Sequence, residues 1–442
     1  MTQTKLRLGR RQAITLAAGT GLAAIGSRGA KAQAASVTLS AWTGYPELVP
    51  FYTAAGEAFA KANPGFKLSV FSTSLREHEQ KLAAAMPTGT GPDLFDVGQI
   101  LSINLIEAGL IQANPAPVEA QLKAAYRAAS LASFTVAGKT YGLPLLFSTP
   151  VLFWNRAMFK EAGLPGAPNT LGEMMDYAKK LVRFDATGKM TRSGMSLRLS
   201  GQGSGITEKF RFILEPAGGS VIKRHPSGKY QQNYDNAAGQ AALQYYIDAV
   251  QVHKVDDPRV QRDAAAFVAG NTAMFFREAW VIGEIQKQNP TLDYDVAQIP
   301  AWTAGQPKKT LLQHNGLYVS GKSRNAAAAY TFMQFLTNPE NSAMLTQTSG
   351  WVAARNDVDW SGLVTRIPQY KGFVAPPADM QYYLEPVLGP WNEIQTRIAD
   401  QLPAAFVDPT LNGNPAKIAE TIKRWATQTD AILKEAGLFG TS

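Results

Sequence analysis

Short apolar runs alternate with amphipathic segments through residues 37–97. A run such as Val-Thr-Leu-Ser-Ala-Trp fits a buried strand, and apolar residues that recur every three or four positions fit a helix. The pattern predicts strands at residues 37–42, 67–71 and 94–97 and helices at residues 47–62 and 77–86. Alternating strands and helices are typical of a parallel α/β sheet, in which ligands lie beyond the carboxyl ends of the strands.

A new stretch opens at Tyr141-Gly142-Leu143-Pro144, a Gly-x-Pro turn suited to hinge one lobe to the next. Beyond it the pattern predicts strands at residues 151–155, 195–199 and 317–319 and helices at residues 171–182, capped by Thr170, and 207–214. Single cores stop growing near roughly 250–300 residues, and this chain is longer. We therefore expect two cores.

Residues 1–34 have the composition of a secretory leader. Basic residues precede an Ala/Gly-rich apolar run over residues 13–25, and Ala32-Gln33-Ala34 supplies the small side chains that signal peptidase accepts. The Arg10-Arg11 pair indicates the twin-arginine route, although Ala13 stands where that signal usually has Phe. We predict export, cleavage near Ala34 and a periplasmic product.

Removing the leader changes the charge of the protein. The whole chain carries a formal charge of +9, and six basic residues of the leader account for most of it. The remaining balance gives no reason to expect a nucleic-acid partner. The chain contains no cysteine, which excludes disulfides, a thiol nucleophile, thiolate metal ligands and a lipidated leader end. The product should therefore be free in the periplasm.

Two glycine-rich segments resemble nucleotide motifs. Residues 316–323 match the P-loop string, but residues 317–319 are themselves the predicted strand, with the turn after it, and an exported protein meets no ATP. Residues 201–205 separate a predicted strand from a helix, so their N–H groups either face an oxygen-rich ligand or form an ordinary turn. The four histidines have no metal-ligand spacing, and no metal, cofactor or catalytic residue is predicted.

Tryptophan positions are more informative than these motifs. Trp42, Trp280, Trp302 and Trp351 follow strands or turns, and aromatic faces stack on the C–H faces of sugar rings. A single tryptophan is more often part of a core than of a ligand site. Several at strand ends and in loops shift the balance toward sugar binding.

Several loose motifs occur in a specific order along the chain. They are residues 141–155 (YGLPLLFSTPVLFWN), 158–164 (MFKEAGL), 168–171, 267–274 (FVAGNTAM) with Trp280, 315–320 (NGLYVS), 327–341 and 350–355 (GWVAAR). Together they resemble the family 1 extracellular solute-binding proteins, the sugar- and glycerol phosphate-binding group of ABC importers. Ala353 stands where that family often has Pro, and Arg277-Glu278 replaces glycines that usually precede Trp280. Arg277 then either meets an anionic ligand group or pairs with Glu278.

The resemblance implies an α/β, two-lobed, type II-like periplasmic binding protein fold, each lobe a mainly parallel sheet flanked by helices. It places residues 35–146 and 316–363 in the amino-terminal lobe and residues 147–315 and 364–442 in the carboxy-terminal lobe. A ligand in the cleft would close the lobes by a hinge motion, and the ABC permease would recognise the closed form. We expect a monomer that binds a sugar or sugar derivative and performs no chemistry.

The candidate ligand-binding residues come from both lobes and the crossovers between them. They are Trp42, Thr43, Tyr45, Ser74, His78 and Gln99 after the first three strands, Phe147 and Ser148 at the crossover, Gln202, Ser204, Arg277 and Trp280 in the second lobe, and Asn315, Trp351 and Arg355. The aromatic rings would stack on the ligand, and the amides and hydroxyls would bridge its oxygens. For an anionic ligand, Arg277 and Arg355 are the candidate charge partners.

Other functions use the same features. A secreted carbohydrate-active hydrolase or lyase would also need a cleft, and counting carboxylates does not exclude a catalytic pair. A binder of glycerol phosphate or another polar solute, or a ligand-sensing partner of a membrane receptor, would share the cleft as well. Release of product from glycosides would identify the hydrolase.

Overall fold

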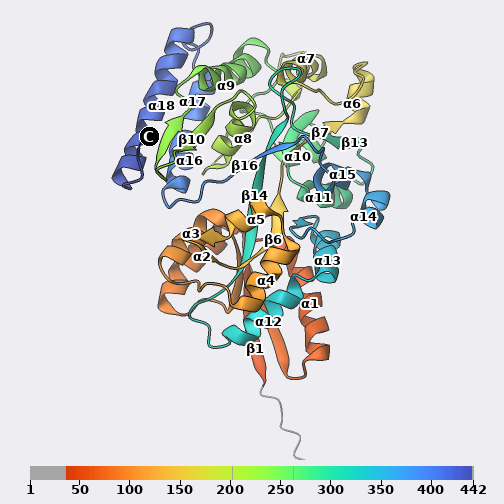
Figure 1. Cartoon of the computed structure of the whole chain (residues 1–442). Coiled ribbons are helices and arrows are strands. Elements are labelled where there is room, and N and C mark those ends of the chain that lie inside the picture. Colours follow the sequence, from red (N-terminus) through yellow and green to blue (C-terminus); the bar gives the residue numbers. More distant parts are fainter. Residues whose placement is uncertain (1–35, 202, 262, 441–442) are drawn as a thin grey trace, which may run out of the picture. The chain divides into compact units, whose positions relative to one another are not determined.

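The computed structural model describes residues 36–201, 203–261 and 263–440 (Figure 1). The predicted leader over residues 1–34 and the candidate ligand residue Gln202 lie outside this part of the chain. The strands are β1 (Val37–Thr43), β2 (Phe66–Ser72), β3 (Leu94–Gly98), β4 (Thr135–Val136), β5 (Lys139–Thr140), β6 (Leu143–Ser148), β7 (Val151–Asn155), β8 (Arg183–Phe184), β9 (Met190–Arg192), β10 (Ser220–Arg224), β11 (Tyr230–Asn233), β12 (Met274–Arg277), β13 (Tyr294–Ala297), β14 (Lys309–Val319), β15 (Val352–Ala353) and β16 (Gln381–Leu384).

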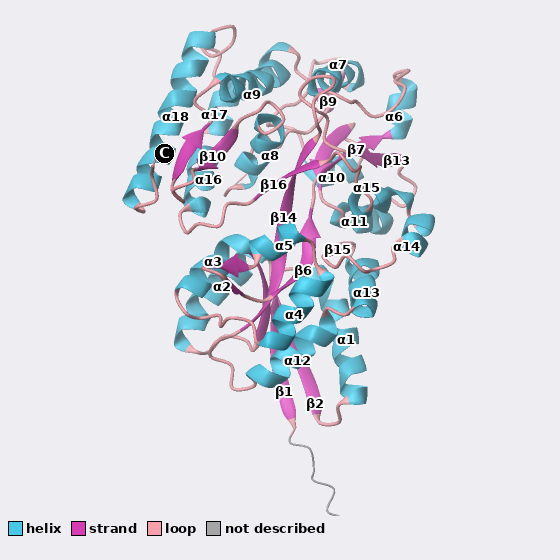
Figure 2. Cartoon of the chain, viewed as in Figure 1, coloured by secondary structure: helices cyan, strands magenta, loops and turns pink. Residues whose placement is uncertain are grey.

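Helices separate most of these strands and cover the sheets (Figure 2). They are α1 (Val49–Ala62), α2 (Leu75–Thr88), α3 (Gln99–Glu107), α4 (Ala116–Ala125), α5 (Ala128–Ser133), α6 (Arg156–Glu161), α7 (Leu171–Leu181), α8 (Gly205–Leu214), α9 (Ala237–Ile247), α10 (Asp263–Val268), α11 (Trp280–Gln288), α12 (Ala326–Leu336), α13 (Pro339–Ser349), α14 (Ser361–Arg366), α15 (Lys371–Val374), α16 (Trp391–Ala399), α17 (Leu402–Val407) and α18 (Pro415–Glu435).

A seven-stranded sheet organises the first lobe. Its strand order is β15-β6-β14-β3-β1-β2, and β16 pairs with the outer part of β14. β1 runs parallel to both β2 and β3, as predicted, whereas β14 runs antiparallel to β3 and β6. The carboxyl ends of β1, β2 and β3 therefore lie at the same edge of the sheet, where a ligand is expected.

The second lobe has a three-stranded sheet whose strand directions differ from those that the resemblance implied. Its strand order is β12-β7-β13, and both pairings are antiparallel rather than mainly parallel. Val151, Leu152 and Phe153 of the central strand β7 are fully buried. A short, continuously apolar run of this kind predicts a buried strand but says nothing about the direction of its neighbours.

Two continuous backbone connections join the sheets. β6 ends at Ser148 and β7 begins at Val151, so only Thr149 and Pro150 separate them. β14 pairs with β16 through residues 309–312 and with β6 and β3 through residues 313–319, so one strand extends from one lobe into the other (Figure 1). If the lobes move relative to each other, the backbone must therefore bend at Thr149-Pro150 and within β14.

Each lobe has its own hydrophobic core. One cluster combines apolar residues between Leu39 and Leu146 with others between Leu317 and Ala354. A second cluster extends from Leu152 to Ile299 and continues from Leu388 to Leu433. A third, smaller cluster contains residues of β7, β12 and α11 together with Val352 and Leu363, so the described residues form three apolar clusters where chain length predicted two cores.

One predicted strand forms only in part. Residues 195–199 lie beside β12, but they are joined to it by the single bridge Ser196↔Phe275. The backbone N–H of Leu197 instead donates to the carboxylate of Asp256, and Arg198 has a φ of +55°. Both features interrupt the ladder, because a strand needs extended φ angles and backbone partners.

The predicted helices at residues 47–62, 77–86, 171–182 and 207–214 are confirmed as α1, α2, α7 and α8, with ends shifted by a few residues. Thr170 caps α7, since its hydroxyl accepts a hydrogen bond from Glu173 N at 3.1 Å. The segment that matched the P-loop string contains the end of β14, so its strand prediction is confirmed too.

Replacing Thr170 with alanine is expected to lower the free energy of unfolding by about 1 kcal/mol, because the first turn of α7 loses a capped N–H group. Urea unfolding followed by circular dichroism measures this change. Thr427→Ala is a suitable control, because the exposed Thr427 hydroxyl only bonds Lys423 O one turn earlier in α18. Equal effects of the two substitutions would contradict the assigned cap.

Candidate functional site

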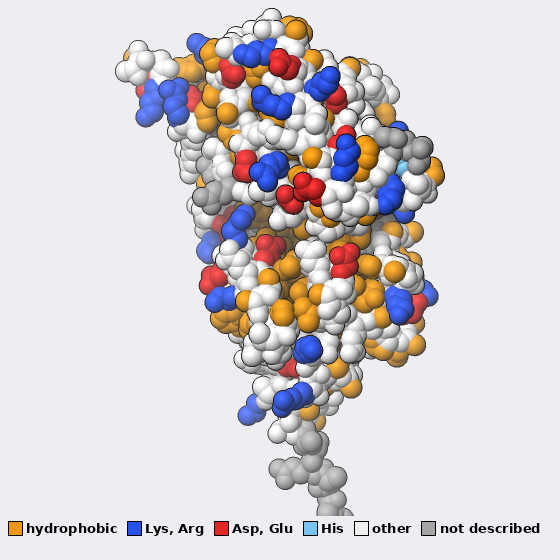
Figure 3. Space-filling view, turned by 90° about the vertical axis from the view of Figure 1, so that its left-hand side faces the viewer, with side chains coloured by type: hydrophobic (Ala, Val, Ile, Leu, Met, Phe, Trp, Pro, Cys, Tyr) orange, Lys and Arg blue, Asp and Glu red, His pale blue; other side chains and the backbone are white. Residues whose placement is uncertain are grey.

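A recess separates two halves of the molecular face shown in Figure 3, with apolar side chains in it and both basic and acidic side chains at its rim. The lobes approach each other at Arg76 of α2 and Gly203 in the turn before α8. The guanidinium of Arg76 lies against Gly203, so this flexible side chain would have to move to make room for a Cβ at residue 203. Gly203 also has a φ of +69°, which favours glycine.

Three aromatic rings form a row between the lobes. Tyr45 packs edge-on against Trp351 with ring centroids 5.4 Å apart, and the Trp351 and Trp280 centroids are 6.4 Å apart. Tyr45 follows β1, Trp351 precedes β15, and Trp280 begins α11, so three distant segments supply the row. Trp280 packs against the core of the first lobe and also against a third apolar cluster that contains β7 and α11 residues.

Carboxylates fix both indoles of this row. Trp351 Nε1 donates to Glu47 Oε1 at 2.7 Å, and Trp280 Nε1 donates to Glu278 Oε2 at 3.1 Å. An indole has one N–H donor, so both donors are already used within the protein. The rings can therefore offer a ligand their faces and edges, but no N–H.

Ion pairs on the second lobe surround Glu278. Lys209 Nζ lies 3.5 Å from its carboxylate and Arg277 Nη1 lies 3.4 Å from it. Burial alone would raise the pKa of Glu278, but Lys209 and Arg277 outweigh burial and lower that pKa. Arg277 also pairs with Asp263 at 2.9 Å, and Arg198 pairs with the same carboxylate at 3.3 Å. Of the two sequence-based interpretations, the structure favours a structural role for Arg277.

Two of the predicted residues, His78 and Asn315, contact Asp96, a buried residue that we did not predict. Tyr52 Oη donates to Asp96 at 2.8 Å, Asn315 Nδ2 lies 3.4 Å from it, and His78 Nε2 contacts the Asp96 carbonyl at 2.7 Å. Burial is the main reason that the pKa of Asp96 is raised. The nearby Thr43 hydroxyl donates to Tyr45 O at 3.4 Å and accepts from Tyr45 N at 3.1 Å. These side chains shape the loop that carries Tyr45. A carboxylate inside the apolar run Leu-Phe-Asp-Val was the available sequence signal.

The other predicted residues are spread along the lobe boundary. Gln99 is buried and its side chain donates to Ser133 O at 3.2 Å within the first lobe. Trp42 packs on Phe71 with centroids 5.3 Å apart, and Ser74 and Ser204 stand at the starts of α2 and α8. Phe147 and Ser148 lie on β6, opposite β14.

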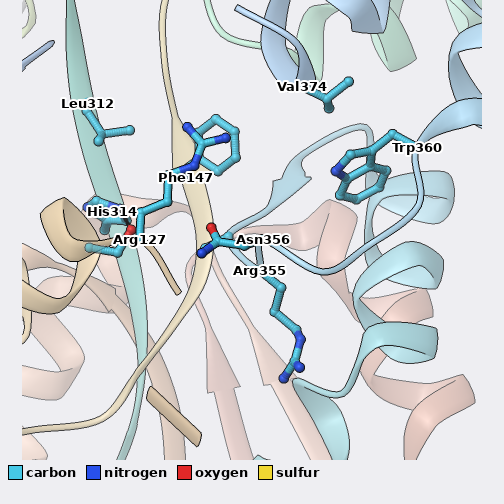
Figure 4. Close-up of a pocket in the computed structure, with 10 residues that line it drawn as sticks. Arg127, Phe147, Leu312, His314, Arg355, Asn356, Trp360 and Val374 are labelled. Carbon is cyan, nitrogen blue, oxygen red and sulfur yellow. Dashed lines mark hydrogen bonds between the residues drawn. The ribbon is translucent and has the colours of Figure 1, made fainter. Parts of the chain in front are cut away.

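A small pocket of about 60 Å³ lies at the crossovers (Figure 4). Its lining residues are Arg127, Ser130, Phe147, Leu312, His314, Ala354, Arg355, Asn356, Trp360 and Val374. His314 is buried and bonded to Ser130 at 2.8 Å, and burial together with Arg127 lowers the pKa of His314 to about 4. One water molecule needs roughly 10–15 Å³ of such a cavity, so the pocket holds about four to six water molecules.

Arg355 lines this pocket, but its charged group is directed elsewhere. Its guanidinium points away from the other labelled residues (Figure 4). It donates to Thr337 O at 2.8 Å and to the carboxylate of Asp357 at 2.6 Å and 2.7 Å. Both arginines predicted as partners of an anionic ligand are thus paired within the protein.

The chain is similar to known proteins in both sequence and fold. The sequence model of one protein family, the bacterial extracellular solute-binding proteins, matches residues 54–372, well over half of the chain. The chain belongs to this family. The family consists of binding proteins, as the sequence resemblance implied. In the described part of this solute-binding protein, no helix is long and apolar enough to cross a membrane, and no group of three potential ligand side chains could hold a metal ion.

Individual relatives match at low identity. The galactooligosaccharide-binding protein of Bacillus subtilis is 25% identical over 62% of this chain and 63% of its own length. The sn-glycerol-3-phosphate-binding periplasmic protein of Salmonella typhimurium is 24% identical over 67% of this chain and 69% of its own. An ABC transporter solute-binding protein from Thermotoga lettingae, solved with α-D-tagatose, superimposes with a TM-score of 0.74 at 22% identity, covering 90% of this chain and 100% of the other. The two-lobed binding-protein fold is confirmed.

Proposed function

We propose that this protein is the substrate-binding component of an ABC importer and that it captures a sugar or sugar derivative between its lobes. Membership of the extracellular solute-binding family carries the proposal. The row of Tyr45, Trp351 and Trp280 supports it, because aromatic surfaces at a lobe boundary suit the apolar faces of sugar rings. Closure would deliver the bound ligand to the transmembrane permease subunits.

We propose that the lobes divide at the predicted boundaries, with residues 35–146 and 316–363 in one lobe and residues 147–315 and 364–442 in the other. The two largest apolar clusters support this division, and the third cluster lies where the two lobes meet, since it combines Val352 and Leu363 with Val151 and Phe275. The predicted Gly142-Leu143-Pro144 hinge is wrong, because Leu143 and Pro144 pair with β14 inside the first-lobe sheet. The hinge would instead lie at Thr149-Pro150 and near residue 313 of β14, where the backbone passes from one sheet to the other. Closure requires bending only at such connections.

We also propose that the protein is exported by the leader over residues 1–34 and acts in the periplasm as a monomer. The basic start, the short apolar run and the Ala32-Gln33-Ala34 end support export. The family name, which describes extracellular proteins, supports the same location.

Affinity in such a cleft would come from enclosing the ligand. Each polar ligand group left without a partner after closure costs about 1–3 kcal/mol, so the cleft must offer a partner to every hydroxyl. The exposed Ser74 and the partly exposed Ser204 stand at the starts of α2 and α8, on opposite lobes. We propose them, with the aromatic row, as the ligand contacts to test first.

A cognate sugar is expected to raise the midpoint of thermal unfolding, because ligand at about 100 times its dissociation constant stabilises the bound form by about 2.7 kcal/mol. A thermal-shift screen over neutral, amino and acidic sugars measures this, and calorimetry then gives the dissociation constant. The sugar should be recovered unchanged. Recovery of a cleaved product would instead favour a hydrolase, and no stabilisation by any sugar would contradict the proposal.

A further inference from the structure

The pocket at the crossovers lies on one face of the strands that join the lobes. His314 of β14 pairs with Phe147 of β6, and Phe147 pairs with Val352 of β15. Paired residues of neighbouring strands point to the same face of a sheet, and so do residues two positions apart in one strand. Leu312, His314, Phe147 and Ala354 therefore form the floor of the pocket, and its other lining residues come from the α5 region and from the chain after β15 (Figure 4).

This face is turned away from the aromatic row. Asn315 follows His314 on β14, and its side chain reaches Asp96, beside the loop that carries Tyr45. Because successive residues of a strand point to opposite faces, His314 points away from that loop. The pocket is therefore separate from the proposed sugar cleft.

A buried imidazole nitrogen in this pocket has no partner. His314 is 1% exposed, and its Nε2 lies 2.8 Å from the Ser130 hydroxyl. Its Nδ1 is buried as well and forms no hydrogen bond with a described residue. Buried polar groups in proteins are almost always hydrogen-bonded, because an unpaired one loses its contact with water and gains nothing in return. A polar group supplied from outside the chain would therefore be stabilised at Nδ1.

The His314 ring is neutral at neutral pH. Burial, together with the nearby charge of Arg127, lowers the pKa of His314 to about 4. A neutral imidazole carries its hydrogen on one nitrogen and accepts at the other. In the tautomer in which the Ser130 hydroxyl donates to Nε2, the ring hydrogen is on Nδ1. The pocket then contains an N–H donor on an uncharged ring.

The charge that faces the pocket is positive. None of the lining residues is acidic. Arg355 is held by the carboxylate of Asp357, and its guanidinium points away from the pocket. Arg127, which directly precedes α5, is exposed and forms no ion pair with a described carboxylate. An arginine without a counter-ion beside an N–H donor suits a carboxylate, because an ionised carboxylate only accepts hydrogen bonds.

The size and the apolar walls of the pocket limit this ligand. A volume of about 60 Å³ takes the place of about four to six water molecules, which corresponds to a ligand of about four to six non-hydrogen atoms. Acetate, propionate and lactate fall within this range. Phe147, Leu312 and Val374 supply apolar surface for a short alkyl group.

We propose that the crossover pocket is a second ligand site and that it binds a small monocarboxylate. The carboxylate would lie between the Arg127 guanidinium and His314 Nδ1, and the alkyl group would lie on Phe147 and Leu312. Arg127 would supply the counter-charge, and His314 would supply a hydrogen bond. The site is on a different face from the sugar cleft, so the failure of either proposal leaves the other intact.

Carboxylates and their uncharged isosteres test the site on the full-length mature protein. Acetate is compared with acetamide, propionate with propanamide and lactate with lactamide, in a buffer without other small carboxylates. Trp360 lines the pocket, so its indole signal in proton–nitrogen NMR spectra reports binding, and Trp360→Phe identifies that signal among those of the 8 tryptophans. We expect at least one carboxylate to bind about tenfold more tightly than its amide, because charge-assisted hydrogen bonds are roughly twice as strong as neutral ones.

Two substitutions separate the charge from the hydrogen bond. Arg127→Gln should weaken carboxylate binding about tenfold and leave amide binding unchanged, because only the carboxylate carries charge. Arg224→Gln is the matched control, because Arg224 is an exposed arginine on β10 that does not line the pocket. His314→Phe should weaken the carboxylate and its amide alike, since both accept a hydrogen bond. Circular dichroism checks the fold of each variant, and the exposed position of Arg127 keeps the test valid if His314→Phe does not fold.

The outcomes are distinct. Equal binding of every carboxylate and its amide would overturn the anionic ligand, and unchanged carboxylate binding in Arg127→Gln would overturn the assigned location. No shift of the Trp360 signal with any probe would overturn the site itself. The thermal-shift screen with sugars remains the separate test of the proposed function.

Discussion

Replacing Glu385 with alanine is expected to lower the free energy of unfolding by about 3–5 kcal/mol, because it leaves the buried Arg211 without its counter-ion. Arg211 Nη1 lies 2.8 Å from Glu385 Oε1, and both side chains are almost fully buried. The Arg211 guanidinium also lies over the rings of Tyr383 and Trp391, at 5.0 Å and 5.2 Å from their centroids. Loss of the carboxylate therefore leaves the buried positive charge of Arg211 without its ion-pair partner.

The same carboxylate serves two further donors. Glu385 Oε2 accepts hydrogen bonds from Trp391 Nε1 and from Gln395 Nε2, so the substitution also leaves two buried donors unpaired. Through Glu385, which follows β16, these contacts join Arg211 of α8 to Trp391 and Gln395 of α16. They therefore connect segments that are far apart in the sequence. A local defect here should thus loosen the second lobe as a whole.

Urea unfolding followed by tryptophan fluorescence measures the effect of Glu385→Ala. Glu393→Ala is the matched control, because Glu393 lies on α16 and pairs with Arg397 at 3.7 Å on the exposed surface. An exposed pair contributes at most about 1 kcal/mol. The double variant Arg211→Met with Glu385→Leu should lose much less than Glu385→Ala alone, since no charge remains unpaired. Equal losses in Glu385→Ala and Glu393→Ala would refute the assigned role.

Replacing Trp280 with alanine is expected to weaken ligand binding by roughly 30- to 100-fold, the effect of removing a central aromatic contact worth about 2–3 kcal/mol. Trp280 packs against the first-lobe core although it begins a helix next to the second-lobe sheet. Its truncation removes a ring from the aromatic row and leaves Glu278 without the indole N–H. The variant should therefore have less aromatic surface for the ligand and a less well fixed Glu278 side chain.

Calorimetry with the ligand found by the thermal-shift screen measures this loss, and circular dichroism checks that the variant folds. Trp302→Ala is the control, since Trp302 is a partly buried indole that packs beside Tyr245 in the second lobe, with centroids 6.5 Å apart. It should change the affinity less than twofold. Trp280→Phe should keep most of the affinity, because it retains a ring. Binding by Trp280→Ala within twofold of the parent protein would exclude Trp280 from the site.

Much of the fold follows from local patterns. The helices α1, α2, α7 and α8 were predicted within a few residues, because apolar periodicity, capping residues and glycine or proline stops act over one or two turns. Chain length predicted two cores, one fewer than the apolar clusters of the described residues, and the order of loose motifs predicted the family. The antiparallel sheet around β7 was not predicted, because an apolar run does not encode which way its partners run.

The candidate site was harder to predict, for a physical reason. The sequence predicted Tyr45, Trp280 and Trp351 as ligand-binding residues, and in the structure their rings form one row. Sequence left the partner of Arg277 open, however, and did not single out Asp96. Neutralisation of a charge depends on which side chains lie within a few ångströms, and Asp263 and Arg277 are fourteen positions apart in the chain.

The sequence by itself determined the family, the alternation of strands and helices, and the residue types that suit a sugar cleft. Tertiary structure alone decided how charge is distributed across that cleft. Asp263 and Glu278 neutralise Arg198 and Arg277 of the second lobe, so these two cations are already paired within the protein. Local propensities act between neighbours in the chain, whereas electrostatic pairing acts between neighbours in space, and only the folded chain defines those.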